Sequence, residues 1–172
     1  MLFCRIVSHK IFEMKKLFLM IALVAATLMF TSGFNEEAVY GGRGETAADV
    51  RLENSFGSVS LKDYRGQYVL LSFWSSEDAA SRMLCANYAR ECGKNGKAVH
   101  LGVNFDEQKA LFEAIVDADS LDAKAQYNIT GKAAASLRHD YRLEGGQLGT
   151  VLIDPKGRIA AVNPTPEQIA KL

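Results

Sequence analysis

The chain alternates short apolar runs with stretches in which apolar residues recur every three or four positions. A continuous apolar run at Tyr68–Trp74 predicts a strand that is buried on both faces of a sheet, and residues 99–105 predict another strand. A shorter stretch at 58–61, in which apolar and polar residues alternate, predicts a strand near the surface. Strands of this kind belong in the core of an α/β domain.

Three stretches have the periodicity of amphipathic helices. The first, at 78–92, has an apolar stripe made of Leu84, Cys85, Tyr88 and Cys92. The second, at 108–119, has a stripe made of Leu111, Phe112, Ile115 and Val116. A third helix is predicted at 132–141. Helices that alternate with strands favour right-handed crossovers and a largely parallel sheet.

The end of the chain predicts a hairpin and a last short helix. Strand patterns at 150–154 and 158–163 flank Asp154, Pro155, Lys156 and Gly157, which occupy the positions that a type I turn favours. A capping box then begins at Thr165, with Pro166 at the first helical position. The predicted fold is therefore a central mixed sheet flanked by helices, with a closing hairpin and a short C-terminal helix.

Composition restricts the kinds of partner. The chain has 172 residues, enough for one domain with its own core, and its 20 basic and 20 acidic residues give a formal net charge of zero. No global field attracts phosphate backbones, so we expect no nucleic-acid partner. His100 falls in a strand and His139 on a helix, without a Cys-x-x-Cys or paired-histidine spacing, so we expect no metal or other cofactor.

The N-terminus has the order of a secretory signal peptide. Met14 is followed by two lysines, an apolar run at 17–30 and then three small residues. This run is shorter than the roughly 20 residues of a membrane-spanning helix, so we expect cleavage and no stable membrane insertion. The predicted organisation is a signal peptide at 1–33 with its true start at Met14, a leader at 34–46 and one domain at 47–172.

The cysteines bear on both location and chemistry. No cysteine directly follows the apolar run, which excludes lipid modification there, so the product is expected to be periplasmic or secreted. Cys4 lies in or before the signal, which leaves Cys85 and Cys92. These two are seven residues apart on one helix, or about 10 Å, whereas a disulfide needs Cα atoms less than about 7 Å apart. We expect both to be small buried hydrophobes with inert thiols.

Two phrases in the sequence resemble a known family. The stretch at 61–74, LKDYRGQYVLLSFW, resembles the entry to the active site in TlpA/ResA-type thiol-disulfide oxidoreductases and their AhpC/TSA redoxin relatives. The stretch at 151–159, VLIDPKGRI, is similar to the closing hairpin of that family. The resemblance covers about residues 44–170, and it implies a thioredoxin-like three-layer fold.

The sequence departs from the family at the active site. The family places a Cys-x-x-Cys motif three residues after Phe-Trp, and here those two cysteine positions hold Asp78 and Ser81. The family's cis-proline position, before a Thr-x-aliphatic phrase that begins at Thr150, holds Leu148. A cis bond without proline would cost about 3 kcal/mol, so we expect a trans peptide there. A carboxylate at 78 would keep the negative charge and cap the helix, but it cannot form a mixed disulfide.

These observations leave three functional hypotheses. The first is a protein without dithiol activity that binds a protein or peptide partner in the cell envelope. The candidate binding face comprises Trp74, Glu77, Asp78, Ser81, Leu148, Gly149 and Thr150. The second hypothesis is an active thiol oxidoreductase or peroxidase that uses Cys85 or Cys92. The third is a structural role without a separate site.

Overall fold

The computed structural model describes residues 42–143, 145 and 147–172. The predicted signal peptide and most of the predicted leader lie outside the described residues. Within the described ranges, no helix is long and apolar enough to cross a membrane.

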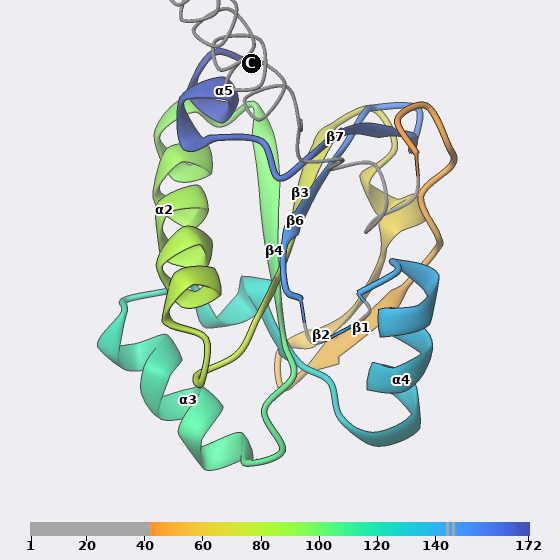
Figure 1. Ribbon diagram of the computed structural model, residues 1–172. Helices are drawn as coiled ribbons and strands as arrows, with labels where there is room; N and C mark the ends of the chain where they lie inside the picture. Colours follow the sequence, from red (N-terminus) through yellow and green to blue (C-terminus); the bar gives the residue numbers. More distant parts are fainter. Residues whose placement is uncertain (1–41, 144, 146) are drawn as a thin grey trace, which may run out of the picture. The chain divides into compact units, whose positions relative to one another are not determined.

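A five-stranded mixed sheet forms the centre of the fold (Figure 1). Its strand order is β5-β4-β3-β6-β7, in which β4 lies parallel to β3 and β5 parallel to β4, whereas β6 and β7 are antiparallel to their neighbours. The strands are β3 (Tyr68–Trp74), β4 (Ala98–Asn104), β5 (Gln126–Asn128), β6 (Thr150–Ile153) and β7 (Ile159–Val162). The predicted mixed sheet and closing hairpin are therefore confirmed.

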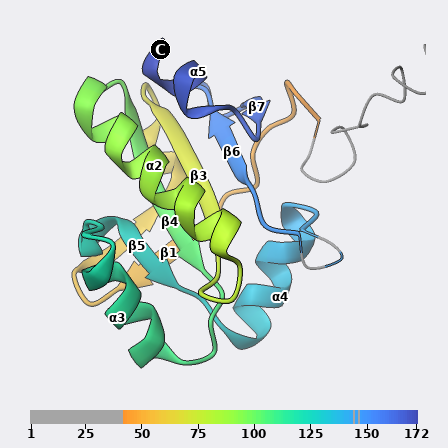
Figure 2. The ribbon, with the colours of Figure 1, turned by 60° about the vertical axis from the view of Figure 1, so that its left-hand side comes forward.

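Helices cover both faces of this sheet, as the two ribbon views show (Figure 2). On one face lie α2 (Ala79–Asn95), α3 (Lys109–Ala118) and α5 (Pro166–Ala170). The other face carries α4 (Gly131–Asp140), which packs into the same apolar cluster as the hairpin β1 (Arg51–Asn54) and β2 (Gly57–Ser60). Two short 3-10 helices complete the described elements, η2 (Leu61–Tyr64) and η3 (Ala123–Ala125). These layers are those of the predicted three-layer fold.

Two strands were missed from the sequence. Strand β1 has a single buried residue, Leu52, and β5 is three residues long with the sequence Gln-Tyr-Asn. Neither strand has enough apolar positions to produce a recognisable alternation. Both are formed by tertiary context: β1 pairs with β2, and β5 completes the parallel edge beside β4.

The predicted apolar stripes of α2 and α3 need a correction. Leu84 is 40% exposed and Leu111 is 41% exposed, although both were placed on buried stripes. On α2 the buried positions are Ser81, Cys85, Tyr88 and Cys92. Each leucine directly precedes a buried residue, and one residue corresponds to about 100° of rotation around a helix. The centre of the stripe therefore faces the sheet, whereas the leucine lies at its margin.

The end of the predicted leader pairs with the domain. The Gly44 amide donates to the Ile159 carbonyl at 2.8 Å, and the Ile159 amide donates to the Glu45 carbonyl at 2.9 Å. Thr46 forms an isolated antiparallel bridge with Arg158. Residues 44–46 thus extend the edge of the sheet beside β7.

Candidate functional site

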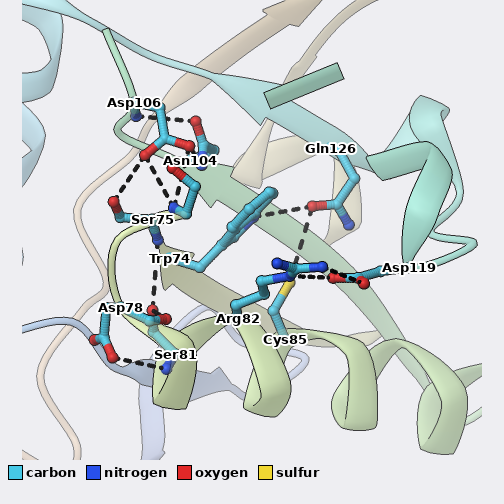
Figure 3. Close-up of polar contacts among 11 residues, drawn as sticks. Trp74, Ser75, Asp78, Ser81, Arg82, Cys85, Asn104, Asp106, Asp119 and Gln126 are labelled. Atoms are coloured by element: carbon cyan, nitrogen blue, oxygen red, sulfur yellow. Dashed lines mark hydrogen bonds and ion pairs between the residues drawn. The ribbon is translucent and has the colours of Figure 1, made fainter. Parts of the chain in front are cut away.

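The candidate site lies where α2 begins, directly after strand β3 (Figure 3). Asp78 is the N-cap residue of α2, and its Oδ1 accepts hydrogen bonds from the amides of Ala80 at 3.0 Å and Ser81 at 3.3 Å. The predicted capping role of Asp78 is confirmed. The carboxylate satisfies amides that would otherwise lack partners at the start of the helix, and its charge suits the positive end of the helix dipole.

Ser81 belongs to the internal structure of this turn. Its side chain is buried, and Oγ donates to the Asp78 carbonyl at 3.0 Å. The same Oγ accepts a hydrogen bond from the Ser75 amide at 3.4 Å. The hydroxyl therefore links the first turn of α2 to the loop before it, and it is not presented to solvent.

A second group of polar side chains fixes the loop at residues 75–77, and sequence analysis missed it. Asp106, just after β4, accepts from the Ser75 hydroxyl at 2.7 Å and from the Ser76 amide at 3.0 Å. Asn104 donates its side-chain amide to Asp106 at 2.9 Å. Burial alone would raise the pKa of Asp106, but these hydrogen bonds together hold the pKa below its ordinary value. The loop is therefore held by a buried carboxylate.

An ion pair connects α2 to the end of α3. The Arg82 guanidinium donates to both carboxylate oxygens of Asp119, at 2.6 and 2.7 Å. Hydrogen bonding from Arg82 lowers the pKa of Asp119, and the same contact raises the pKa of Arg82. Bidentate pairs of this kind fix orientation as well as distance. The first turns of α2 are thus held from the loop side by Asp106 and from the α3 side by Asp119.

Cys85 and Cys92 lie on the buried side of α2, as predicted. Cys85 is 1% exposed and Cys92 is 4% exposed, and they do not form a disulfide. Burial, with a smaller contribution from the charge of Asp119, raises the pKa of Cys85 to about 12. Burial, followed by the charge of Glu91, raises the pKa of Cys92 to about 11. Both groups are neutral thiols at physiological pH, whereas thiol chemistry needs the thiolate.

Cys85 lies in a row of buried polar side chains between the sheet and α2, which sequence analysis also missed. The Trp74 indole donates to Gln126 Oε1 at 3.1 Å, and Cys85 Sγ lies 3.9 Å from the same oxygen and 3.9 Å from His100 Nε2. The row continues through Ser72 Oγ, which lies 3.1 Å from His100 Nε2 and accepts from the Thr150 hydroxyl at 3.2 Å. Burial lowers the pKa of His100 to about 4, so this imidazole is neutral at physiological pH.

The predicted binding face is smaller than expected. Trp74, Ser81 and Thr150 are 0, 6 and 3% exposed, and Gly149 is buried as well. Trp74 faces the interior because its ring packs against Phe112 of α3, with the ring centroids 5.9 Å apart. The members that reach the surface are Glu77, which is exposed, and Asp78 and Leu148, which are partly exposed.

The loop that carries Leu148 and the helix α2 each have a defined place near the predicted face. The Phe73 amide donates to the Gly149 carbonyl at 2.8 Å, which holds the loop beside the end of β3. The described residues contain no cis peptide bond, so the predicted trans peptide at Leu148 is confirmed. Met83, on the second turn of α2, is 66% exposed. Sequence analysis missed Met83, although its position outside the buried stripe of the helix was visible in the periodicity.

The fold defines a thioredoxin-like protein, in which Asp78 and Ser81 lie at the start of α2. Residues 43–162 match the AhpC/TSA family, and the chain belongs to that family. No curated protein gives a significant match.

Solved structures similar to this chain share its fold. The thioredoxin domain of a thiol-disulfide oxidoreductase from Bacteroides vulgatus is 21% identical, with a TM-score of 0.68 over 76% of this chain and 94% of that chain. A thioredoxin-like protein from Parabacteroides distasonis is 29% identical, with a TM-score of 0.61 over 74% and 96%. A secreted thiol-disulfide isomerase from Corynebacterium glutamicum is 20% identical, with a TM-score of 0.63 over 81% and 91%.

Proposed function

We propose that this protein is an exported member of the thioredoxin-like family that has lost dithiol redox activity and binds a protein or peptide partner in the cell envelope. The observation that supports this most strongly is that the side chains of Asp78 and Ser81 have structural roles at the start of α2. Asp78 caps α2 and Ser81 joins its first turn to the preceding loop. Both positions act as structural parts of the helix start, and neither side chain can exchange electrons with a disulfide.

The surrounding contacts support the same proposal. A cysteine at a helix N-terminus attacks a disulfide as a thiolate, which the unpaired amides of the helix stabilise. Here the Asp78 carboxylate already accepts hydrogen bonds from two of those amides. The loop before the helix is held by Asp106, and the helix itself is held by the ion pair between Arg82 and Asp119. The site is therefore organised as a fixed surface.

The alternative, a thiol enzyme that uses Cys85 or Cys92, has one contact in its favour. Cys85 Sγ lies 3.9 Å from His100 Nε2, the kind of pair in which a histidine base activates a cysteine. However, that nitrogen also lies within hydrogen-bonding distance of Ser72 Oγ, and burial lowers the pKa of His100 to about 4 while it raises the pKa of Cys85 to about 12. These shifts oppose proton transfer from the thiol to the imidazole. Burial of both groups therefore weighs against the thiol enzyme, and we prefer the binding protein.

The partner-binding surface that we propose surrounds the start of α2. It combines the exposed Glu77, the partly exposed Asp78 and Leu148, and the strongly exposed Met83. Exposed thioether and aliphatic side chains supply apolar contact area, and the flanking carboxylates restrict which partners fit. Export is supported by the order of residues 14–33, and one similar structure is of a protein described as secreted.

Activity assays test the loss of redox chemistry. We expect the purified mature protein neither to reduce insulin nor to consume peroxide above the background rate. Cys85→Ser should leave this background unchanged. Turnover that persists after removal of contaminating thioredoxin and disappears in Cys85→Ser would support the enzyme and contradict our proposal.

Restoring the cysteines tests whether positions 78 and 81 correspond to the family's dithiol. Asp78→Cys combined with Ser81→Cys should oxidise to an intramolecular disulfide, seen as a loss of two hydrogens in the intact mass and as resistance to alkylation. The single variant Ser81→Cys is the matched control and should remain an alkylatable thiol after denaturation. If the folded double variant keeps two free thiols under mild oxidation, the assignment of these positions is wrong.

Site-specific crosslinking tests the proposed surface. A photoreactive amino acid in place of Glu77 should give a discrete adduct in the native envelope. The same photoreactive amino acid in place of Lys132 should give none, because Lys132 is exposed on α4, on the opposite face of the sheet. Equal labelling from both positions would contradict a binding surface at α2.

Recovery of the full-length chain in the membrane pellet after a carbonate wash would contradict cleavage and export as a soluble product.

A further inference from the structure

A groove lies away from the start of α2, between the β1–β2 hairpin and helix α3. Its volume is about 480 Å³, within the range of about 300 to 1,000 Å³ that is typical of small-molecule sites. Phe112 and Val116 of α3 and Leu121 after it supply apolar walls, and Phe56 lies opposite on the hairpin. Phe56 is 61% exposed, so within the described part of the chain a large aromatic side chain at the edge of this groove is mostly open to solvent.

Gln126 provides an unused hydrogen-bond donor in the lining of this groove. The residue is 1% exposed, and its buried Nε2 has no hydrogen-bond partner among the residues that the structure describes. The orientation of the amide is determined by Trp74, because an indole N–H only donates and therefore requires the oxygen. Figure 3 shows the nitrogen on the side of the amide that faces away from Trp74. A buried N–H without a partner costs about 1 to 3 kcal/mol, which a bound acceptor would recover.

A glycine on the neighbouring strand leaves the space that the Gln126 side-chain amide occupies. Gly102 pairs with Gln126 across β4 and β5, and a Cβ atom at Gly102 would lie only 2.0 Å from Gln126 Oε1. Any larger residue at position 102 would displace the amide. The bare backbone of Gly102 therefore allows the glutamine to lie flat against the sheet, with its oxygen toward Trp74.

The charges around the groove indicate which ligands fit. Its lining includes the acidic residues Glu53, Glu113 and Asp117 and one basic residue, Lys109. Lys109 forms an ion pair with Glu113 at 3.3 Å. Arg51 forms a second ion pair with Glu53 at 3.1 Å, so much of the charge around the groove is neutralised, and the excess of carboxylates disfavours an anion.

We propose that this groove binds a small uncharged amphipathic molecule, with an aromatic or aliphatic body against Phe56 and Phe112 and a carbonyl oxygen that accepts a hydrogen bond from Gln126 Nε2. The binding needs no redox step and uses none of the residues of the proposed partner surface. It is therefore a second site, independent of the surface at the start of α2.

Trp74 reports on the occupancy of this groove. It is the only tryptophan in the sequence, and it contacts two groove residues, Gln126 through its indole N–H and Phe112 through its ring. The probe we choose is Prodan, a neutral naphthalene that carries a propionyl ketone and whose emission moves to shorter wavelength in apolar surroundings. Titration should give saturable binding, with a blue shift of Prodan and energy transfer from Trp74.

Phe56→Ala tests whether the probe occupies this groove. Loss of the ring should weaken Prodan binding about fivefold, equivalent to roughly 1 kcal/mol. Leu111→Ala is the matched control, because Leu111 lies exposed on α3 but does not line the groove, and it should bind Prodan like the wild type. Absence of saturable binding, or equal affinities for wild type and Phe56→Ala, would overturn the proposal.

The hydrogen bond is tested with two probes and one variant. The wild type should prefer Prodan about 3- to 10-fold over the analogue in which a propyl group replaces the propionyl group. Gln126→Met, which keeps the side-chain length and removes the amide, should abolish this preference. Gln126 also lines a smaller cleft with Cys92 and His100. If Gln126→Met removes the preference while Phe56→Ala has no effect, the probe occupies that cleft and the proposal for the groove is wrong.

Discussion

The two faces of the central sheet are built from different chemistry. Toward α4, strand β3 contributes Val69, Leu71 and Phe73, which join one large apolar cluster. Toward α2 and α3, the same strand contributes Leu70, Ser72 and Trp74, and Ser72 begins the buried polar row. One strand therefore serves a large apolar core on one side and, on the other, an interior in which apolar residues surround a hydrogen-bonded polar row.

The two faces therefore differ in how precisely their buried side chains must be placed. The α4 face stabilises the domain through apolar burial, which requires volume and little direction. The α2 face buries polar groups, which cost free energy unless each has a partner, so its residues must be placed accurately. Cys85 lies on this second face between His100 and Gln126, where burial holds it in the thiol form.

The largest effect is expected from a cavity on the apolar face. Leu71 is fully buried, so Leu71→Ala should lower the free energy of unfolding by about 2 to 5 kcal/mol, because the lost contacts leave a cavity. Chemical denaturation monitored by Trp74 fluorescence measures this change. Leu84→Ala, at an exposed position on α2, should change stability by less than about 0.5 kcal/mol. Similar losses of unfolding free energy in both variants would contradict the difference in burial between Leu71 and Leu84.

The polar face should make the domain sensitive to acid through His100. Its pKa is about 4 in the folded protein and 6.5 ordinarily, so the unfolded chain takes up a proton first as pH falls. Stability should therefore be complete above pH 6.5 and fall by about 3 kcal/mol between pH 6.5 and 4. His100→Gln should flatten the pH dependence over this window in urea denaturation. An equally steep fall in that variant would assign the acid sensitivity to other groups.

A smaller effect is expected where the polar row loses one member. Ser72→Ala leaves the Thr150 hydroxyl and the His100 imidazole without their shared partner, which should cost about 1 to 3 kcal/mol of unfolding free energy. Adding Thr150→Val removes one of the abandoned groups, so the double variant should lose less than the sum of the two single variants. Strict additivity in this double-mutant cycle would show that the two hydroxyls are not coupled.

The same contrast explains how much could be predicted from sequence. Tyr68–Trp74 was recognised as a doubly buried strand because six of its seven residues are apolar, which also concealed the role of the single polar residue, Ser72. Periodicity placed Cys85, Tyr88 and Cys92 correctly on the buried side of α2. Patterns of this kind predict which residues are buried, and that is most of what is needed to predict the packing of the apolar face.

The polar contacts of the site could not be predicted in the same way. Asp106 reaches Ser75 across 31 positions and Arg82 reaches Asp119 across 37, and nothing local in the sequence relates such partners. The capping role of Asp78 was predictable because a cap acts within three residues of itself. Trp74 was misplaced on the surface because its neighbour Phe112 comes from a distant helix.

The smallest effect is expected at the cap, and it tests how position 78 is used. Asp78→Ala removes the acceptor of the Ala80 and Ser81 amides and should lower the unfolding free energy by about 1 kcal/mol. Asp78→Ser retains a short side-chain oxygen at the N-cap and should recover most of this loss. Urea denaturation of the three proteins, in parallel, measures both steps. If alanine and serine at this position are equally stable, the carboxylate is held there for a reason other than capping, and binding at the α2 surface becomes the explanation to test through the crosslink at position 77.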